Sequence, residues 1–235
     1  MRIEFTSIGC VSATVLARNE DYARRLGFPK WSPAASQRLA VVGGGPSITD
    51  RVEELAAWDG DIWAINGAVG WCMRQGIDAV LFTIDPLPAT AKHATGVERA
   101  FVSVTCHPSL FDALQGADIE AFKPTLTGAT TATAAPIAAA DKGYRSVTFF
   151  GCESSFGDAT HVYGNRDVKN LMRVRCNGQE FLTTPDMMMQ AEFLGELIRE
   201  APMFAERSGG LLSACVADPE IDVIAATPLI HEAVA

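Results

Sequence analysis

The stretch "LAVVGGGPSITDRVEEL" (residues 39–55) decides how this chain folds. An apolar run stops at three glycines, a proline and a serine, and an acidic amphipathic segment follows. This order is typical of a β-strand that leads into a helix through a tight, glycine-lined turn. Glycines let backbone N–H groups approach a ligand, and a helix N-terminus carries about half a positive charge, so the turn is a candidate anion site. A tight turn that binds nothing is the alternative.

The turn departs from the two common nucleotide motifs. No Gly-Lys-Ser/Thr follows it, so it is not a Walker A loop. Ile48 stands where a dinucleotide fingerprint has its third glycine, and the next strand ends in Asn66 where NAD requires an acid, which argues against NAD. Ser47 and Asp50 fit a capping box, in which Ser47 caps the helix and Asp50 reaches back.

Apolar runs alternate with helical patterns along the rest of the chain. The runs predict strands at residues 38–44, 61–67, 78–85, 99–106, 117–124, 146–154 and 210–216. The helical patterns fall at residues 19–27, 48–58, 68–76, 108–116, 129–143 and 185–201. Because most of the strands are continuously apolar, we predict an α/β, Rossmann-like fold, with a mostly parallel sheet and helices on both faces. We expect an N-terminal segment, residues 1–37, packed on a single domain, residues 38–235.

The amino-acid composition indicates which binding partners and which cellular compartment to expect. With 19 basic and 28 acidic residues the net charge is −9, spread along the chain, which argues against nucleic acid or a membrane as partner. The six cysteines show no pairing pattern, and several lie in apolar runs, so we expect buried thiols in a reducing cytoplasm. The apolar stretch near the start is too short and too broken for a signal peptide or a membrane span.

Polar residues gather where the predicted strands end, which is where ligands bind in such sheets. Asn66 can donate and accept hydrogen bonds to a ribose or base, or it forms an Asn-Gly turn. Asp85 suits Mg²⁺ or a substrate hydroxyl, or it caps its own turn. The sequence leaves both alternatives open.

Two further segments carry candidate groups. "LTGATTATAAP" (residues 126–136) puts hydroxyls and a glycine at a helix start, where they bind an anion or cap the helix. "FFGCESSFGDATHVYGNRD" (residues 149–167) runs from a core strand into Glu153, His161 and Tyr163, which suit acid/base chemistry or metal contacts.

Three segments together resemble the MptE-like family: "VVGGGPSI" (41–48), "GATTATAAPIAAADKGYRSVTFFGCESSF" (128–156) and "HVYG" (161–164). This family includes archaeal 6-hydroxymethyl-7,8-dihydropterin pyrophosphokinases, bacterial motility accessory factors and uncharacterised bacterial and phage proteins. The resemblance covers residues 38–165 and implies Mg²⁺-assisted pyrophosphoryl transfer. Glu153 stands where the family has Asp, and this longer carboxylate still suits a metal.

The same layout is similar to bacterial sialyltransferases, which use a CMP-sugar. Those enzymes place a catalytic histidine shortly before the final helix. The corresponding region here, "RVRCNGQEFLTTPD" (residues 173–186), has none. Glycosyl transfer would therefore require His161 in that role.

The sequence thus predicts a nucleotide-dependent transferase that binds a phosphorylated ligand at the carboxyl edge of the sheet. Alternatives are a CMP-sugar-dependent glycosyltransferase, a non-catalytic nucleotide or sugar-phosphate binder of phage origin, and a scaffold subunit. Whether the chain forms a homo-oligomer is left open. The predicted ligand-binding residues are Gly43, Gly44, Gly45, Pro46, Ser47, Asn66, Thr127, Gly128, Thr130 and Ser154. The predicted catalytic residues are Glu153, His161 and Tyr163, and the predicted Mg²⁺ ligands are Asp85 and Glu153.

Overall fold

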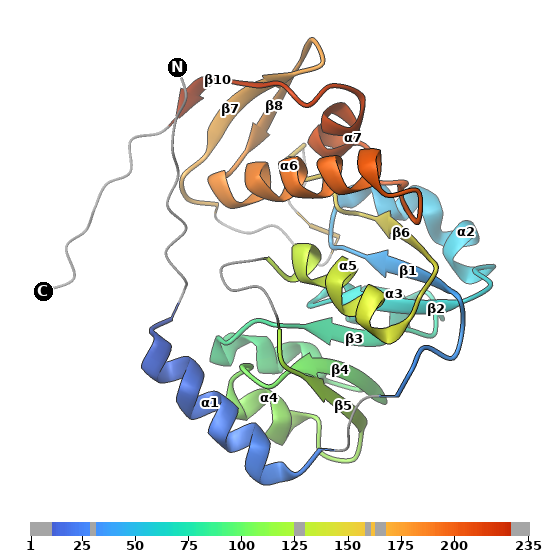
Figure 1. Cartoon of the computed structure of the whole chain (residues 1–235), viewed down its shortest axis with the longest axis vertical. Coiled ribbons are helices and arrows are strands. Elements are labelled where there is room, and N and C mark those ends of the chain that lie inside the picture. Colours follow the sequence, from blue (N-terminus) through green and yellow to red (C-terminus); the bar gives the residue numbers. More distant parts are fainter. Residues whose placement is uncertain (1–10, 29–31, 125–129, 158–160, 163–167, 227–235) are drawn as a thin grey trace, which may run out of the picture.

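A computed structural model describes residues 11–28, 32–124, 130–157, 161–162 and 168–226. Its centre is a sheet of seven parallel strands in the order β5-β4-β3-β2-β1-β6-β9 (Figure 1). The strands are β1 (Arg38–Val42), β2 (Asp61–Ile65), β3 (Val80–Thr83), β4 (Arg99–Ser103), β5 (Asp118–Phe122), β6 (Ser146–Phe150) and β9 (Phe204–Glu206).

Helices cover both faces of this sheet, because each central strand is apolar on both sides. Val42 and Ala64 belong to the core that α2, α3 and α4 cover. Val41 and Trp63, one position earlier in each strand, belong to the core that α5 and α6 cover. The helices are α1 (Ala13–Leu26), α2 (Val52–Ala56), α3 (Ala68–Arg74), α4 (Pro108–Ala113), α5 (Thr131–Lys142), α6 (Pro185–Glu200) and α7 (Gly210–Ala217), with 3₁₀ helices η1 (Pro46–Arg51) and η2 (Pro88–Ala94). The predicted Rossmann-like fold class is confirmed.

The strand order places a switch point beside β1. From β1 the chain adds β2, β3, β4 and β5 in one direction, and it then returns to the other side of β1 for β6. The two connections that leave β1 and β6 therefore run in opposite directions. In open parallel sheets this arrangement creates a crevice at the carboxyl ends of the two strands, and ligands bind there.

The N-terminal helix α1 packs against α4, on the β4 side of the sheet (Figure 1). The Tyr22 hydroxyl donates to Asp112 Oδ1 at 2.5 Å, and Lys123 forms an exposed ion pair with Glu20 at 3.0 Å. Buried Asn19 donates from Nδ2 to the backbone oxygen of Thr105 at 3.1 Å, two residues beyond β4. The N-terminal segment thus reaches the carboxyl edge of the sheet.

A second, antiparallel sheet follows β6, with strand order β10-β7-β8. It contains β7 (Met172–Cys176), β8 (Gln179–Thr183) and β10 (Ile221–Ala226). Asn177 and Gly178, both with positive φ, form the turn between β7 and β8, as a two-residue hairpin requires. This sheet packs on α6 and α7.

The predicted strand at residues 210–216 is wrong, because this segment is the helix α7. Its run of apolar residues is short, and such a run does not distinguish a strand from a buried helix. Gly209, with φ 76°, ends the preceding extended segment, and the helix begins directly after it. Leu211 and Cys215, one helical turn apart, then pack toward the second sheet.

The five described cysteines are free and buried, as the sequence predicts. Burial raises the pKa of the Cys72 thiol to about 12. Within the described residues, no helix is both long and apolar enough to cross a membrane.

Candidate functional site

The glycine turn, residues 43–47, lies against the end of β6. Gly43 N–H donates to Phe150 O at 2.7 Å, and Gly45 N–H donates to Gly151 O at 2.9 Å. A Cβ on Gly43 would overlap Gly151 O, so only glycine fits there. The turn thus continues the hydrogen-bond ladder between β1 and β6. Two N–H groups of the turn, those of Gly43 and Gly45, are already bonded in this ladder.

The carboxylate of Glu153 occupies this turn. Glu153 Oε1 accepts the N–H of Ser47 at 2.6 Å, and a Cβ on Gly45 would overlap the carboxylate. Glu153 is 8% exposed, and its Oε2 has no hydrogen-bond partner among the described residues. In this structure the turn therefore holds an anion that belongs to the chain itself.

The backbone around Glu153 fixes its position. Gly151, with φ 62°, lies so close to Ile48 that a Cβ there would overlap the Ile48 side chain. Ser154, with φ 57°, is the only described residue with positive φ that is neither glycine nor asparagine. This conformation costs about 1–2 kcal/mol for a residue with a Cβ. Leu212 N–H also donates to Glu153 O at 3.0 Å, so α7 holds the same segment.

The predicted capping box at Ser47 and Asp50 is wrong. The turn leads into η1, whose N-cap is Gly45 and has no side-chain hydrogen bond. Ser47 Oγ is buried without a partner instead. Since η1 has six residues and α2 has five, no long helix dipole starts at the turn, and its polarity comes from individual backbone groups.

Asn66 ends β2 in the left-handed conformation, with φ 49°. Its backbone N–H donates to Phe82 O at 3.3 Å, and its own oxygen accepts Val69 N–H at 3.3 Å. The side-chain Oδ1 is buried and has no partner. Ala64 of β2 pairs with Val42 of β1, so Asn66 lies beside the glycine turn.

Asp85 lies farther along the same edge and caps its own turn. Its Oδ1 accepts Leu87 N–H at 2.9 Å, and its N–H donates to Thr83 Oγ1 at 3.1 Å. Two strands separate β3 from β6, so the ends of these strands lie about 14 Å apart. Oxygens that bind one Mg²⁺ lie within about 4 Å of each other. Asp85 and Glu153 therefore do not share an ion in this arrangement.

Metal-binding side chains do not gather at any single place in the described part of the chain. No group of three or more His, Cys, Asp or Glu residues there is arranged to hold an ion. A metal at this edge would thus take ligands from a bound phosphate or from water as well as from the protein.

Two of the predicted ligand-binding residues meet through a residue that the sequence did not indicate. Thr130, the N-cap of α5, donates from Oγ1 to Gln190 Oε1 at 2.7 Å. Gln190 on α6 donates from Nε2 to Ser154 Oγ at 2.9 Å. This partly buried chain of hydrogen bonds joins α5, α6 and the end of β6. Thr127 and Gly128 lie outside the described residues.

His161 is half-buried beside the glycine turn. The next residue, Val162, donates its N–H to Gly44 O at 3.0 Å, which brings His161 to the edge where Glu153 lies. Tyr163 lies outside the described residues.

Unsatisfied oxygens gather at this one edge. In the described part of the chain, buried side-chain oxygens without a hydrogen-bond partner occur in Asn19, Ser47, Asn66 and Glu153. Ser47, Asn66 and Glu153 follow the neighbouring strands β1, β2 and β6, and Asn19 contacts the loop after β4. The carboxyl edge is therefore the polar site that the fold builds.

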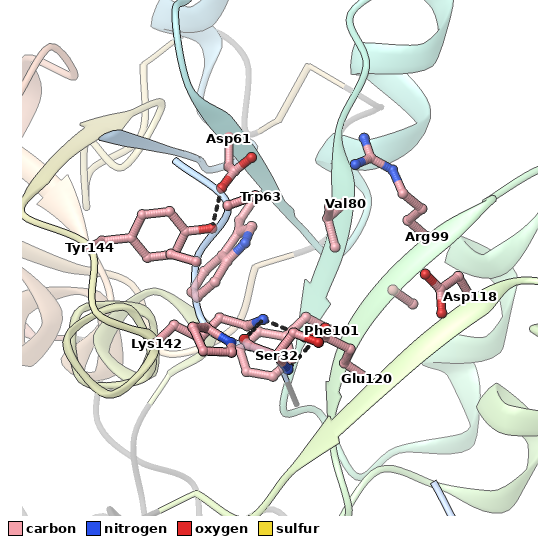
Figure 2. Close-up of a pocket in the computed structure, with 14 residues that line it drawn as sticks. Ser32, Asp61, Trp63, Val80, Arg99, Phe101, Asp118, Glu120, Lys142 and Tyr144 are labelled. Atoms are coloured by element: carbon pink, nitrogen blue, oxygen red, sulfur yellow. Dashed lines mark hydrogen bonds and ion pairs between the residues drawn. The ribbon is translucent and has the colours of Figure 1, made fainter. Parts of the chain in front are cut away.

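A cavity of about 190 Å³ lies at the opposite edge, where β2, β3, β4 and β5 begin (Figure 2). Asp61, Arg99 and Asp118 stand at its rim, each the first residue of its strand. Trp63 and Phe101 line its apolar interior, with ring centroids 5.1 Å apart.

The cavity contains its own cation. Lys142 pairs with Glu120, and its Nζ lies 4.7 Å from the centroid of the Phe101 ring (Figure 2). The Tyr144 hydroxyl donates to Asp61 Oδ2 at 2.7 Å. Burial, and then this hydrogen bond, raise the pKa of Tyr144 far above its usual value. Since these polar groups satisfy one another, we take the carboxyl edge as the candidate site.

No family model and no curated protein matches the chain. A comparison with solved structures returns the crystal structure of a protein from Lactobacillus plantarum, 15% identical with a TM-score of 0.26. The match covers 51% of this chain and 48% of that one, so it spans about half of each.

Proposed function

We propose that the chain is a nucleotide-dependent transferase that binds a phosphorylated ligand at the carboxyl edge of its sheet. The reaction would be pyrophosphokinase-like and assisted by Mg²⁺. The observation that carries the proposal is the group of four buried, unsatisfied oxygens at this edge. Each such atom costs about 1–3 kcal/mol when it stays without a partner. A ligand that satisfies them recovers this free energy on binding.

The chemistry of these oxygens favours a nucleotide. The side-chain oxygens of Asn19 and Asn66 accept hydrogen bonds, so they suit the hydroxyl and amino groups of a ribose and base. The Ser47 hydroxyl can donate, so it suits a phosphate oxygen. Donors and acceptors spread along one edge of the sheet match an extended molecule that carries both kinds of group.

Glu153 is the residue that fits Mg²⁺ best. Its Oε2 is a hard oxygen ligand, it is buried, and no described residue donates a hydrogen bond to it. When bound, Mg²⁺ would offset the negative charge of the transferring phosphates. Glu153 would hold the ion from the β6 side of the crevice.

The remaining residues would orient the reactants. Asp85 lies three strand spacings from Glu153 along the edge of the sheet. It would accept a hydrogen bond from the acceptor hydroxyl. Gln190 would hold Thr130 and Ser154 in place against the ligand. His161, beside the turn, would take part in proton transfer.

A thermal-shift panel tests the proposal. The probes are CMP, CTP, ATP, GTP, UDP and a pterin, each with and without Mg²⁺. A probe at about 100 times its Kd should stabilise the protein by about 2.7 kcal/mol, a rise in Tm of about 5–10 °C. We expect a Mg²⁺-dependent rise with a triphosphate. A Mg²⁺-independent rise with CMP would indicate a CMP-sugar transferase, and no rise with any probe would refute the proposal.

Two asparagines provide a matched control for the site. Asn66 and Asn177 have nearly the same backbone conformation, with φ 49° and 48°, but Asn177 is exposed in the hairpin of the second sheet. Asn66→Ala and Asn177→Ala should therefore introduce similar backbone strain. Only Asn66→Ala should reduce the ligand-induced rise in Tm, and an equal reduction in both variants would contradict the assignment of Asn66.

A further inference from the structure

Glu153 stands where the proposed ligand would place its phosphate. The Ser47 N–H, which is a donor of the glycine turn, already binds Glu153 Oε1 at 2.6 Å. The space above the Cα of Gly45, which the absence of a side chain leaves open, is filled by the same carboxylate. A phosphate oxygen cannot use this donor or this space while the carboxylate remains.

A second carboxylate, that of Glu206, provides a comparison, because both of its oxygens accept hydrogen bonds. Glu206 Oε2 accepts the N–H groups of Ser208 at 2.6 Å and Gly209 at 3.2 Å, and its Oε1 accepts the Ser213 hydroxyl at 2.6 Å. Both oxygens of Glu206 are thus satisfied. Glu153 is more deeply buried than Glu206, yet its Oε2 has no partner among the described residues.

Glu153 is therefore held in the turn less strongly than Glu206 is held in its own position. A buried carboxylate needs several hydrogen bonds or a cation to offset the loss of water. Glu153 Oε1 accepts one hydrogen bond, from Ser47 N–H, and Oε2 accepts none from the described residues. A cation outside the turn that binds the carboxylate would therefore compete with this single hydrogen bond.

We propose that Glu153 is an internal anion that must leave the turn before a phosphate group binds there, and that a divalent cation bound by this carboxylate favours its departure. The inference rests on the proposed function, because it concerns the same site. In the exchange, the hydrogen bond from Ser47 N–H to Glu153 Oε1 breaks, and one from Ser47 N–H to a phosphate oxygen forms. The carboxylate then faces the cation instead of the turn.

Electrostatics explains why the two anions exclude each other. Two negative charges at contact distance repel each other strongly, even at the dielectric of a protein surface. A divalent cation between them replaces this repulsion with two attractions. Ligand binding by the wild type is therefore expected to require the cation, and removal of the carboxylate should remove that requirement.

The experiment measures the binding of inorganic pyrophosphate by isothermal titration calorimetry, in Mg²⁺ and in EDTA. The proteins are the wild type, Glu153→Ala and Glu153→Gln. Asp118→Asn is the control, since it removes one exposed carboxylate at the opposite edge of the sheet. Circular dichroism shows whether each variant is folded, and Glu153→Gln keeps the shape of the side chain if Glu153→Ala does not fold.

We expect the wild type and Asp118→Asn to bind pyrophosphate in Mg²⁺ and at least about tenfold more weakly in EDTA, a difference of about 1.4 kcal/mol. Glu153→Ala and Glu153→Gln should bind about equally in the two buffers, and tighter than the wild type in EDTA. If these variants bind no tighter than the wild type in EDTA, or lose binding in both buffers, Glu153 does not block the turn. The proposed function survives that result as long as the wild type binds in Mg²⁺, and absence of wild-type binding in both buffers overturns both proposals.

Discussion

The substitution Gly45→Ala tests whether Glu153 really occupies the glycine turn. Gly45 has φ −70° and ψ 151°, which alanine adopts without strain. Alanine should therefore stabilise the protein by about 0.4–1 kcal/mol, because it restricts the unfolded chain. The new Cβ, however, overlaps the Glu153 carboxylate and displaces it from Ser47 N–H. A hydrogen bond to a charged group contributes about 1.5–3 kcal/mol, so the net loss should be about 1–2 kcal/mol.

A double-mutant cycle isolates this contact. In a Glu153→Ala background no carboxylate remains to be displaced, so Gly45→Ala should be neutral or slightly stabilising. Urea unfolding of the four proteins should give a coupling free energy of about 1.5–3 kcal/mol. Gly157→Ala is the control, since a Cβ there meets no atom within 4 Å, and it should change stability little in either background. An equal cost of Gly45→Ala with and without Glu153 would refute the placement of the carboxylate.

Other predictions concern the core and the opposite edge. Because the folded pKa of Tyr144 is raised, the wild type should lose stability as the pH rises above about 10, where the unfolded phenol ionises. Tyr144→Phe should show a smaller alkaline loss in urea unfolding, and an unchanged loss would contradict this. Lys142→Met breaks a largely buried ion pair and should lower the free energy of unfolding by about 3 kcal/mol. Lys123→Met, at an exposed pair, should lower it by less than about 1 kcal/mol. Equal losses in thermal unfolding would contradict the role of the buried pair. Gln190→Leu removes the hydrogen-bond partner of the buried Ser154 hydroxyl and of the half-buried Thr130 hydroxyl. It should cost about 1–3 kcal/mol and weaken ligand binding, and unchanged stability would refute the network.

Most of the central sheet follows from the sequence, because most of its strands are continuous apolar runs that end in glycine or a polar residue. The runs extend beyond the paired residues, and the run at 78–85 contains the shorter strand β3 (Val80–Thr83). The hairpin of β7 and β8 also has a sequence signal, in its Asn177-Gly178 turn and in the alternation of apolar residues with arginine along β7. The three-residue strand β9 is too short for any periodic pattern to indicate it.

The strand ends locate the candidate site, but the contacts within it depend on packing. The glycine turn, Asn66 and Glu153 are separated in sequence and meet because parallel strands bring their carboxyl ends to one edge. The hydrogen bond from Ser47 to Glu153 spans 106 residues, and no local pattern encodes it. Asn19 and Gln190 lie on helices whose orientation is set by the whole core, so their roles at this edge could not be predicted.

The most direct test of the account is a crystal structure of the protein with Mg²⁺ and the nucleotide that gives the largest rise in Tm. We expect the phosphates beside the glycine turn, with the base or ribose near Asn66 and the Glu153 carboxylate no longer bonded to Ser47 N–H. A nucleotide bound instead in the cavity at the amino-terminal edge, around Trp63 and Lys142, would contradict the assignment of the site.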